Sequence, residues 1–295
     1  MSETAPAPIV SARGLRKHFG KTEILHGLDF DIPPGRIYGL VGHNGAGKTT
    51  TLNALLGLTS YEGTVRVLGE DPYQKRARLM ENVAFISDVA SLPRFLRVRE
   101  LFALIANIHP NFDQQKARSF LDGTDVRMDA KIKNLSKGMI AQLHLAVVMA
   151  IDAKLLVLDE PTLGLDITYR KRFYRRLLED YMTEERTLLI TTHQVDEIEF
   201  MLSDIMFIRD GDLILHMQME TVSTRYAQVL VDPANVEAAR ALGPIYAETR
   251  FGQTAMVFDG VDRDRLADFG AVSTPSLSDL FVALMQRTPG AGEPR

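Results

Sequence analysis

The chain has 295 residues, of which 45% are hydrophobic and 24% charged, and its net charge is −4 at pH 7. This length suits one large domain or two smaller ones with a buried core. The mild acidity, without a long basic run, argues against a nucleic-acid-binding protein. The absence of cysteine excludes disulfides, thiolate nucleophiles and cysteine-based metal sites. The longest apolar run, residues 145–151, is far shorter than the roughly 20 residues that span a bilayer.

The N-terminal third reads as strands around a glycine-rich loop. Residues 1–8 are polar, contain proline and have no apolar core for a signal peptide, so a flexible N-terminus is expected. Strands are predicted over residues 9–10, 24–30, 37–41 and 64–68, separated by turn sequences.

The glycine-rich loop, GHNGAGKT at residues 42–49, fits the phosphate-binding pattern G-x-x-x-x-G-K-[ST] of P-loop NTPases. A strand precedes it and a helix is predicted to follow, which aims backbone N–H groups at a phosphate chain. Lys48 is expected to reach the β- and γ-phosphates, and the Thr49 hydroxyl to ligate Mg²⁺. A glycine-rich turn with a stray lysine is the alternative, and the flanking elements argue against it. The predicted nucleotide contacts here are Gly42, Asn44, Gly45, Ala46, Gly47, Lys48, Thr49 and Thr50.

The middle of the chain changes character. After a short strand at 83–86, apolar residues at 98, 101, 102, 105 and 108 fall on one helix face. A second helix is predicted over 112–121, started by Asn111. Residues from about 90 to 150 therefore indicate a helical insertion.

Strands and helices alternate after Ala153, which predicts a mostly parallel sheet covered on both faces. The predicted strands are 155–158, 188–191 and 205–208, and the predicted helices 167–182 and 195–202. From about residue 226 the units become short and nothing looks catalytic, so a small α+β C-terminal domain is expected over 223–287, with a disordered tail at 288–295.

Two acids end the apolar strand at 155–158. A buried strand does not end in paired carboxylates for packing reasons, because both are costly to desolvate. Beside a phosphate loop, Asp159 is expected to hold Mg²⁺ through its water shell, and Glu160 to act as general base on the attacking water. An acidic surface turn is the alternative.

Two further features stay open on the residues alone. Ser136 and Gly138 begin a predicted helix whose N-terminus is either an anion site or an ordinary serine cap. His193 ends another apolar strand and is either structural or a contact of the γ-phosphate or the water.

The order of these motifs is diagnostic. The phosphate loop, the helical insertion, LSKGM at 135–139, LLVLDE at 155–160, LGLD at 163–166 and TTH at 191–193 together resemble the ATP-binding cassette (ABC) family over about residues 9–217. The resemblance implies an α/β fold: a P-loop NTPase core with an antiparallel β subdomain and an inserted helical subdomain, forming a nucleotide-binding domain over 9–222 that binds and hydrolyses Mg²⁺-ATP.

The resemblance also implies residue roles. Phe19 corresponds to the aromatic residue that stacks on adenine, Ser136 and Gly138 to the kept positions of the signature motif, and Asp166 to the D-loop. His193 corresponds to the switch histidine. Lys137 and Met139 depart from the usual LSGGQ.

The Q-loop is a further departure. Asp88 stands where glutamine is usual, and we predict that it contributes to the Mg²⁺ site and links metal arrival to loop closure. A solvated loop acid is the alternative. The neighbouring residues 89–100, with Leu92, Phe95 and Leu96, are predicted to contact a membrane partner, against the alternative of a loop packed on its own subdomain.

The family works as a head-to-tail dimer in which ATP lies between one P-loop and the partner's signature motif. LSKGM, TTHQVDE and the short C-terminal extension are similar to the ATPase subunits of ABC-2-type exporters, whose permeases are separate chains. The resemblance thus implies a homodimer, a transmembrane permease partner, no nucleic acid, and a peripheral position at the cytoplasmic face of the cell membrane. The alternative is a soluble ABC ATPase that acts on translation, DNA or cluster assembly.

Overall fold

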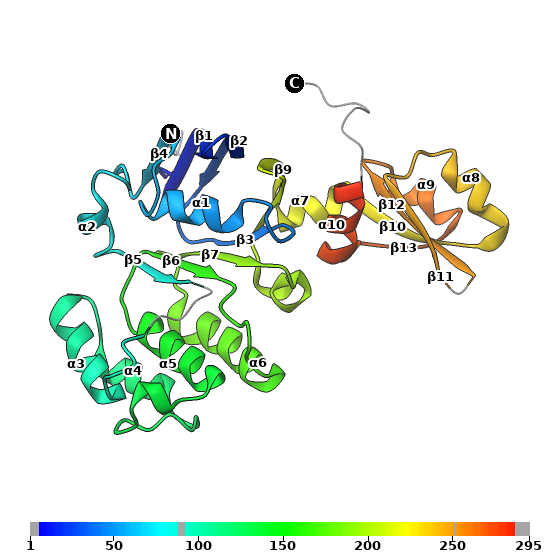
Figure 1. Cartoon of the computed structure of the whole chain (residues 1–295). Coiled ribbons are helices and arrows are strands. Elements are labelled where there is room, and N and C mark those ends of the chain that lie inside the picture. The colour runs from blue at the N-terminus through cyan, green and yellow to red at the C-terminus, as the bar shows by residue number, and fades with distance from the viewer. Residues whose placement is uncertain (1–5, 88–91, 251, 287–295) are drawn as a thin grey trace, which may run out of the picture.

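The computed structural model describes residues 6–87, 92–250 and 252–286, which form three sheets and the helices around them (Figure 1). The central sheet has the order β5-β6-β7-β3-β8-β9, and its neighbours run parallel except for the β8–β9 pair. Its strands are β3 (Ile37–Val41), β5 (Val83–Ile86), β6 (Leu155–Asp159), β7 (Thr187–Thr192), β8 (Asp204–Arg209) and β9 (Asp212–Gln218). Every residue of β6 and β7 is buried, as expected of strands covered on both faces.

A second sheet, antiparallel and of order β2-β1-β4, lies over the helix that follows the phosphate loop (Figure 1). Its strands are β1 (Val10–Phe19), β2 (Thr22–Ile32) and β4 (Glu62–Val67). Together with α1 (Lys48–Leu55) and one face of the central sheet, they enclose a separate hydrophobic core. α2 (Arg76–Leu79) follows β4. The predicted α/β fold with an antiparallel β subdomain is confirmed.

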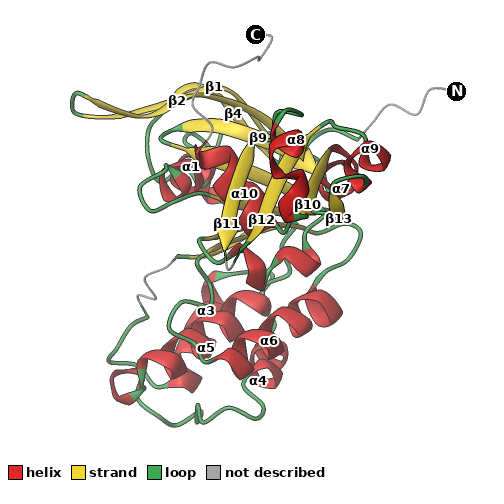
Figure 2. Cartoon of the chain, turned by 90° about the vertical axis from the view of Figure 1, so that its right-hand side faces the viewer, coloured by secondary structure: helices red, strands yellow, loops and turns green. Residues whose placement is uncertain are grey.

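The opposite face of the central sheet carries the helical part of the chain, which stays gathered at one end of the molecule when the view is turned (Figures 1 and 2). It comprises α3 (Val98–Ile108), α4 (Gln114–Phe120), a 3₁₀ turn η1 (Ile132–Asn134), α5 (Lys137–Met149) and α6 (Ile167–Arg176). A π-helical turn, η2 (Leu177–Tyr181), extends α6.

Two predicted helices differ from the structure. The helix after Pro110 begins at Gln114, because the Asp113 carboxylate, not Asn111, accepts hydrogen bonds from the first turn. Residues 195–202 form two 3₁₀ turns, η3 (Val195–Glu197) and η4 (Glu199–Met201), in place of one helix. Glu197 bonds to Arg170 of α6, and the Asp196 carboxylate accepts a hydrogen bond from Ser278 of the last helix.

The C-terminal part forms a four-stranded antiparallel sheet of order β11-β12-β10-β13 with its own small core. Its elements are β10 (Tyr226–Val231), η5 (Pro233–Asn235), α8 (Val236–Arg240), β11 (Tyr246–Arg250), β12 (Gln253–Asp259), α9 (Arg263–Ala267) and β13 (Gly270–Ser273). This is a βαββαβ arrangement, joined to β9 by α7 (Met219–Arg225). The sequence patterns did not predict its strand order.

The last helix, α10 (Leu277–Gln286), packs back onto the central part of the molecule (Figure 1). Its Phe281 ring meets Phe207 of β8 edge to face at 5.2 Å between centroids, and Leu277, Leu280 and Leu284 belong to the main core. The Arg209 guanidinium donates to the carbonyls of Leu284 and Met285, 3.1 and 3.2 Å away, which satisfies the end of the helix. Among the described residues, no helix is both long and apolar enough to cross a bilayer.

Candidate functional site

The phosphate loop connects β3 to α1. Gly45 and Gly47 have φ angles of 86° and 111°, values in the left-handed region that favours glycine. Gly42 is required for a different reason, because a Cβ there would lie 2.5 Å from the carbonyl oxygen of Ile208. The glycines thus set the shape of the loop.

We expect Gly42→Ala to destabilise the fold by about 1–3 kcal/mol, the usual cost of forcing extra volume into a packed site. Gly138→Ala is the matched control, because nothing lies within 4 Å of its Cβ position and alanine suits a helix better. Thermal and urea unfolding of the two variants would measure the difference. Equal stability of both would contradict the tight packing of the loop.

Lys48 is folded back onto this loop. Its side-chain amine donates to the carbonyl oxygens of Gly42 and His43 at 2.7 and 3.2 Å, and the residue is buried. Burial lowers the pKa of the amine, while the carboxylates of Glu160 and Asp159 oppose that shift. A cation that is partly desolvated and held by two carbonyls is well placed to receive an anionic phosphate.

Asp159 is fixed between two hydroxyls. It pairs in register with Thr191 on the neighbouring strand, and the Thr191 hydroxyl donates to its carboxylate. The Thr49 hydroxyl donates to the other carboxylate oxygen at 2.9 Å. A hydroxyl and a carboxylate oxygen, side by side at the end of a phosphate loop, are the hard ligands that Mg²⁺ takes along with waters and phosphate oxygens. Sequence reasoning missed Thr191, although it is the first residue of the TTH motif.

Glu160 and His193 face each other across the ends of β6 and β7. His193 Nδ1 lies 2.9 Å from a Glu160 carboxylate oxygen. Glu160 has a φ of 47°, rare for a residue with a side chain, and its N–H donates to the carbonyl of Thr191. Such backbone conformations gather at functional sites, where the surrounding fold enforces them.

A cavity of about 440 Å³ joins these groups. Its lining consists of Asn44, Gly45, Gly47, Lys48, Thr49, Thr50, Asp159, Glu160, Leu163 and His193. Nine of these ten residues were predicted as site residues; Leu163 was recognised only as part of LGLD. Gly42 and Ala46 are buried within the loop itself. The parallel register explains why these residues lie together. Val41 pairs with Thr192 and Asp159 with Thr191, so the phosphate loop, the paired acids and the TTH motif all follow strands that end at one edge of the sheet.

Comparison with known proteins identifies the family. The family profile described as "ABC transporter" matches residues 25–163. A Nod factor export ATP-binding protein I of Burkholderia lata is 36% identical over 214 residues, which cover 70% of this chain and 69% of that protein. The chain belongs to the ABC transporter family. It is an ATP-binding subunit of that family, as the motif order predicted, and thus an ATPase.

Other relatives of this ABC ATPase agree. An uncharacterized ABC transporter ATP-binding protein of Methanocaldococcus jannaschii is 28% identical, covering 75% of this chain and 82% of that protein. A solved structure titled "Structure of ATP binding subunit of ABC transporter" superposes with a TM-score of 0.67 at 20% identity, over 72% of this chain and 91% of the other. That likeness shows the fold.

Besides Gly42 and Ala46, four predicted site residues of the ABC ATPase lie outside the lining of the cavity. Phe19, at the end of β1, is 56% exposed, and the Lys17 amine lies 4.9 Å from its ring centre. Ser136 caps α5, its hydroxyl accepting from the Met139 N–H. Asp166 caps α6 in the same way, and Gly138 lies in the first turn of α5. Asp88, the fifth, lies outside the described residues.

Proposed function

We propose that this ABC ATPase powers export: two copies close head to tail on Mg²⁺-ATP, and hydrolysis drives a separate transmembrane permease. The observation that carries the catalytic part is the Glu160–His193 contact at 2.9 Å, in the same cavity as Lys48. The export part rests on the relatives, several of which bear the name Nod factor export ATP-binding protein I.

Each residue has a defined task in this proposal. Lys48 exchanges its loop carbonyls for the β- and γ-phosphate oxygens of ATP. Glu160 accepts a proton from the attacking water, and His193 holds the Glu160 carboxylate toward it. Thr49 and Asp159 would hold Mg²⁺, which neutralises charge on the phosphates when bound.

The dimer is proposed because two predicted nucleotide contacts do not reach the cavity of their own chain. Ser136 and Gly138 sit at the N-terminus of α5 but do not line their own chain's cavity. The N-terminus of a helix attracts anions, so the N-terminus of α5 binds the γ-phosphate of the ATP that lies in the partner's phosphate loop. Asp166 then faces the partner, and Phe19 takes the adenine. The working complex lies at the cytoplasmic face of the cell membrane.

The permease contact is proposed for the loop before α3. Leu92 and Leu96 pack against the main core, so they are not free to dock. Phe95 is 78% exposed, with the exposed Arg94 beside it. A large aromatic side chain that is exposed beside a cation is typical of an interface anchor.

Phe95→Asp is therefore expected to release the protein from membranes that contain its permease, because it places a charge where an apolar anchor docks. Its ATPase activity away from membranes should not change. Membrane flotation and phosphate release would measure the two effects. Ile108→Asp is the matched control, since Ile108 is 71% exposed on the same helical part; if both variants stay bound equally, Phe95 is not the anchor.

A further inference from the structure

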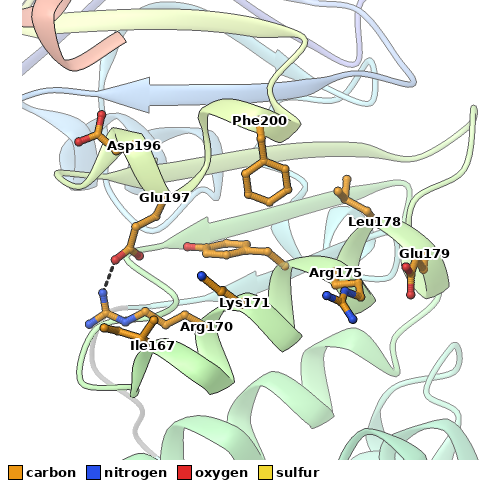
Figure 3. Close-up of a pocket in the computed structure, with 10 residues that line it drawn as sticks. Ile167, Arg170, Lys171, Arg175, Leu178, Glu179, Asp196, Glu197 and Phe200 are labelled. Carbon is orange, nitrogen blue, oxygen red and sulfur yellow. Dashed lines mark hydrogen bonds and ion pairs between the residues drawn. The ribbon is translucent and has the colours of Figure 1, made fainter. Parts of the chain in front are cut away.

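Arg170 bonds to two separate segments of the chain, the LGLD loop and the segment after His193. It lies on α6 at the edge of a cavity of about 580 Å³ between α6 and the η3–η4 segment (Figure 3). Its Nε donates to the carbonyl oxygen of Leu165 at 2.9 Å. Its Nη1 donates to the Gln194 side-chain oxygen at 2.8 Å and forms an ion pair with Glu197, drawn as the dashed line in Figure 3.

One end of this connection is the LGLD loop. Leu165 belongs to that loop, and Asp166 is the N-cap of α6 itself. One turn after Arg170, the Tyr174 hydroxyl lies 3.1 Å from that of Thr162, with both groups buried. These bonds join α6 to the segment from Thr162 to Asp166, which contains the LGLD loop.

The other end is the segment that carries the histidine of the cavity. Gln194 follows His193 directly, and Glu197 is in the 3₁₀ turn that comes next. A guanidinium offers five N–H donors in a planar fork and stays charged at any relevant pH, so one side chain can hold both segments at fixed spacing. The Arg170 side chain is only 20% exposed, which limits solvent screening of its ion pair with Glu197.

We propose that Arg170 is a positioning residue that couples the two ATP sites of the dimer. It transmits the position of the LGLD loop, which faces the partner's site, to His193 and Glu160 of its own chain. This inference rests on the proposed head-to-tail dimer. It assigns Arg170 no contact with nucleotide.

Mixed dimers test it. Two differently tagged chains are co-purified, and one carries Glu160→Gln, so that only the other chain's site turns over. Arg170→Met is then placed in the active chain, in the Glu160→Gln chain, or in both. We expect each single placement to lower kcat roughly 2- to 30-fold, the range of coupling effects, without changing KM. The double placement should be slower than either single placement, because each Arg170 joins its own chain's LGLD loop to its own chain's histidine and the two changes alter two separate connections.

The trans placement is decisive. If Arg170 merely stabilises its own chain, its substitution slows turnover only when it is made in the active chain. That result would overturn the proposal. Full activity in all three mixed dimers would also overturn it. Lys171→Met is the matched control: the next residue of the same helix lines the same cavity and has no hydrogen-bond or ion-pair partner among the described residues. It should leave kcat unchanged.

Two further variants keep the test sharp. Glu197→Gln removes the ion pair and leaves the Leu165 and Gln194 bonds, so it should give the same trans effect in weaker form, even if Arg170→Met folds poorly. Arg170→Lys keeps the charge without the planar fork and should fail to restore kcat. Two other results would contradict the proposed function itself. Glu160→Gln homodimers that still hydrolyse ATP would show that Glu160 is not the general base. A chain that hydrolyses ATP only as a monomer would rule out the dimer and, with it, the coupling.

Discussion

Glu160→Gln is expected to lower ATP turnover by roughly 10²–10⁴-fold, the usual loss when a general base is removed. ATP binding should persist, because the groups around the phosphates, Lys48 and Thr49 among them, are untouched. The ATP-bound dimer should therefore accumulate. Phosphate release and size-exclusion chromatography with labelled ATP would measure both effects.

The matched control is Glu185→Gln, which removes an exposed carboxylate outside the cavity lining. It should turn over at the parental rate. Lys48→Ala should instead weaken nucleotide binding itself, which separates binding from chemistry. An Ala or Gln variant at Glu160 with the parental rate would remove it from the mechanism.

Mixing two inactive chains is expected to restore activity. Lys48→Ala abolishes the phosphate loop of one chain, and Ser136→Arg blocks the helix N-terminus that the other chain offers to its partner. A mixed dimer then contains one site built from the two intact halves and one built from the two damaged halves. Equal mixing should recover about a quarter of the parental rate per chain, since half of the dimers are mixed and each has one working site.

The controls are the two chains assayed alone. If Ser136→Arg alone is fully active, the sandwich arrangement is wrong for this protein. Mixing that restores nothing at any ratio would mean that the mixed dimer does not form or that both sites must fire together, and cross-linking of the tagged chains would decide between the two.

The parts of the site that sequence could predict are those encoded locally. The phosphate loop is contiguous, and its glycines and lysine specify its geometry within eight residues. Asp159, Glu160 and His193 were found because each ends an apolar strand, and parallel strands bring their carboxyl ends to one edge. The α/β fold followed from the same alternation of strands and helices.

What sequence did not predict depends on side chains that are far apart in the chain. The Thr191–Asp159 bond needs the register of two strands, and the reach of Arg170 to Glu197 needs the packing of two segments. The contacts of residues 195–202 have the same origin, because Glu197 bonds to α6 and Asp196 to the last helix. The periodicity of residue types describes one segment at a time, so it does not predict contacts between segments.

The return of α10 also sets a limit on how this protein is made. Three leucines of residues 277–286 belong to the main core, and the Phe207 ring is covered by Phe281. The core around β8 therefore cannot be completed during synthesis until this helix has left the ribosome. Until then β8 exposes an apolar ring, a surface on which chaperones and aggregation both act.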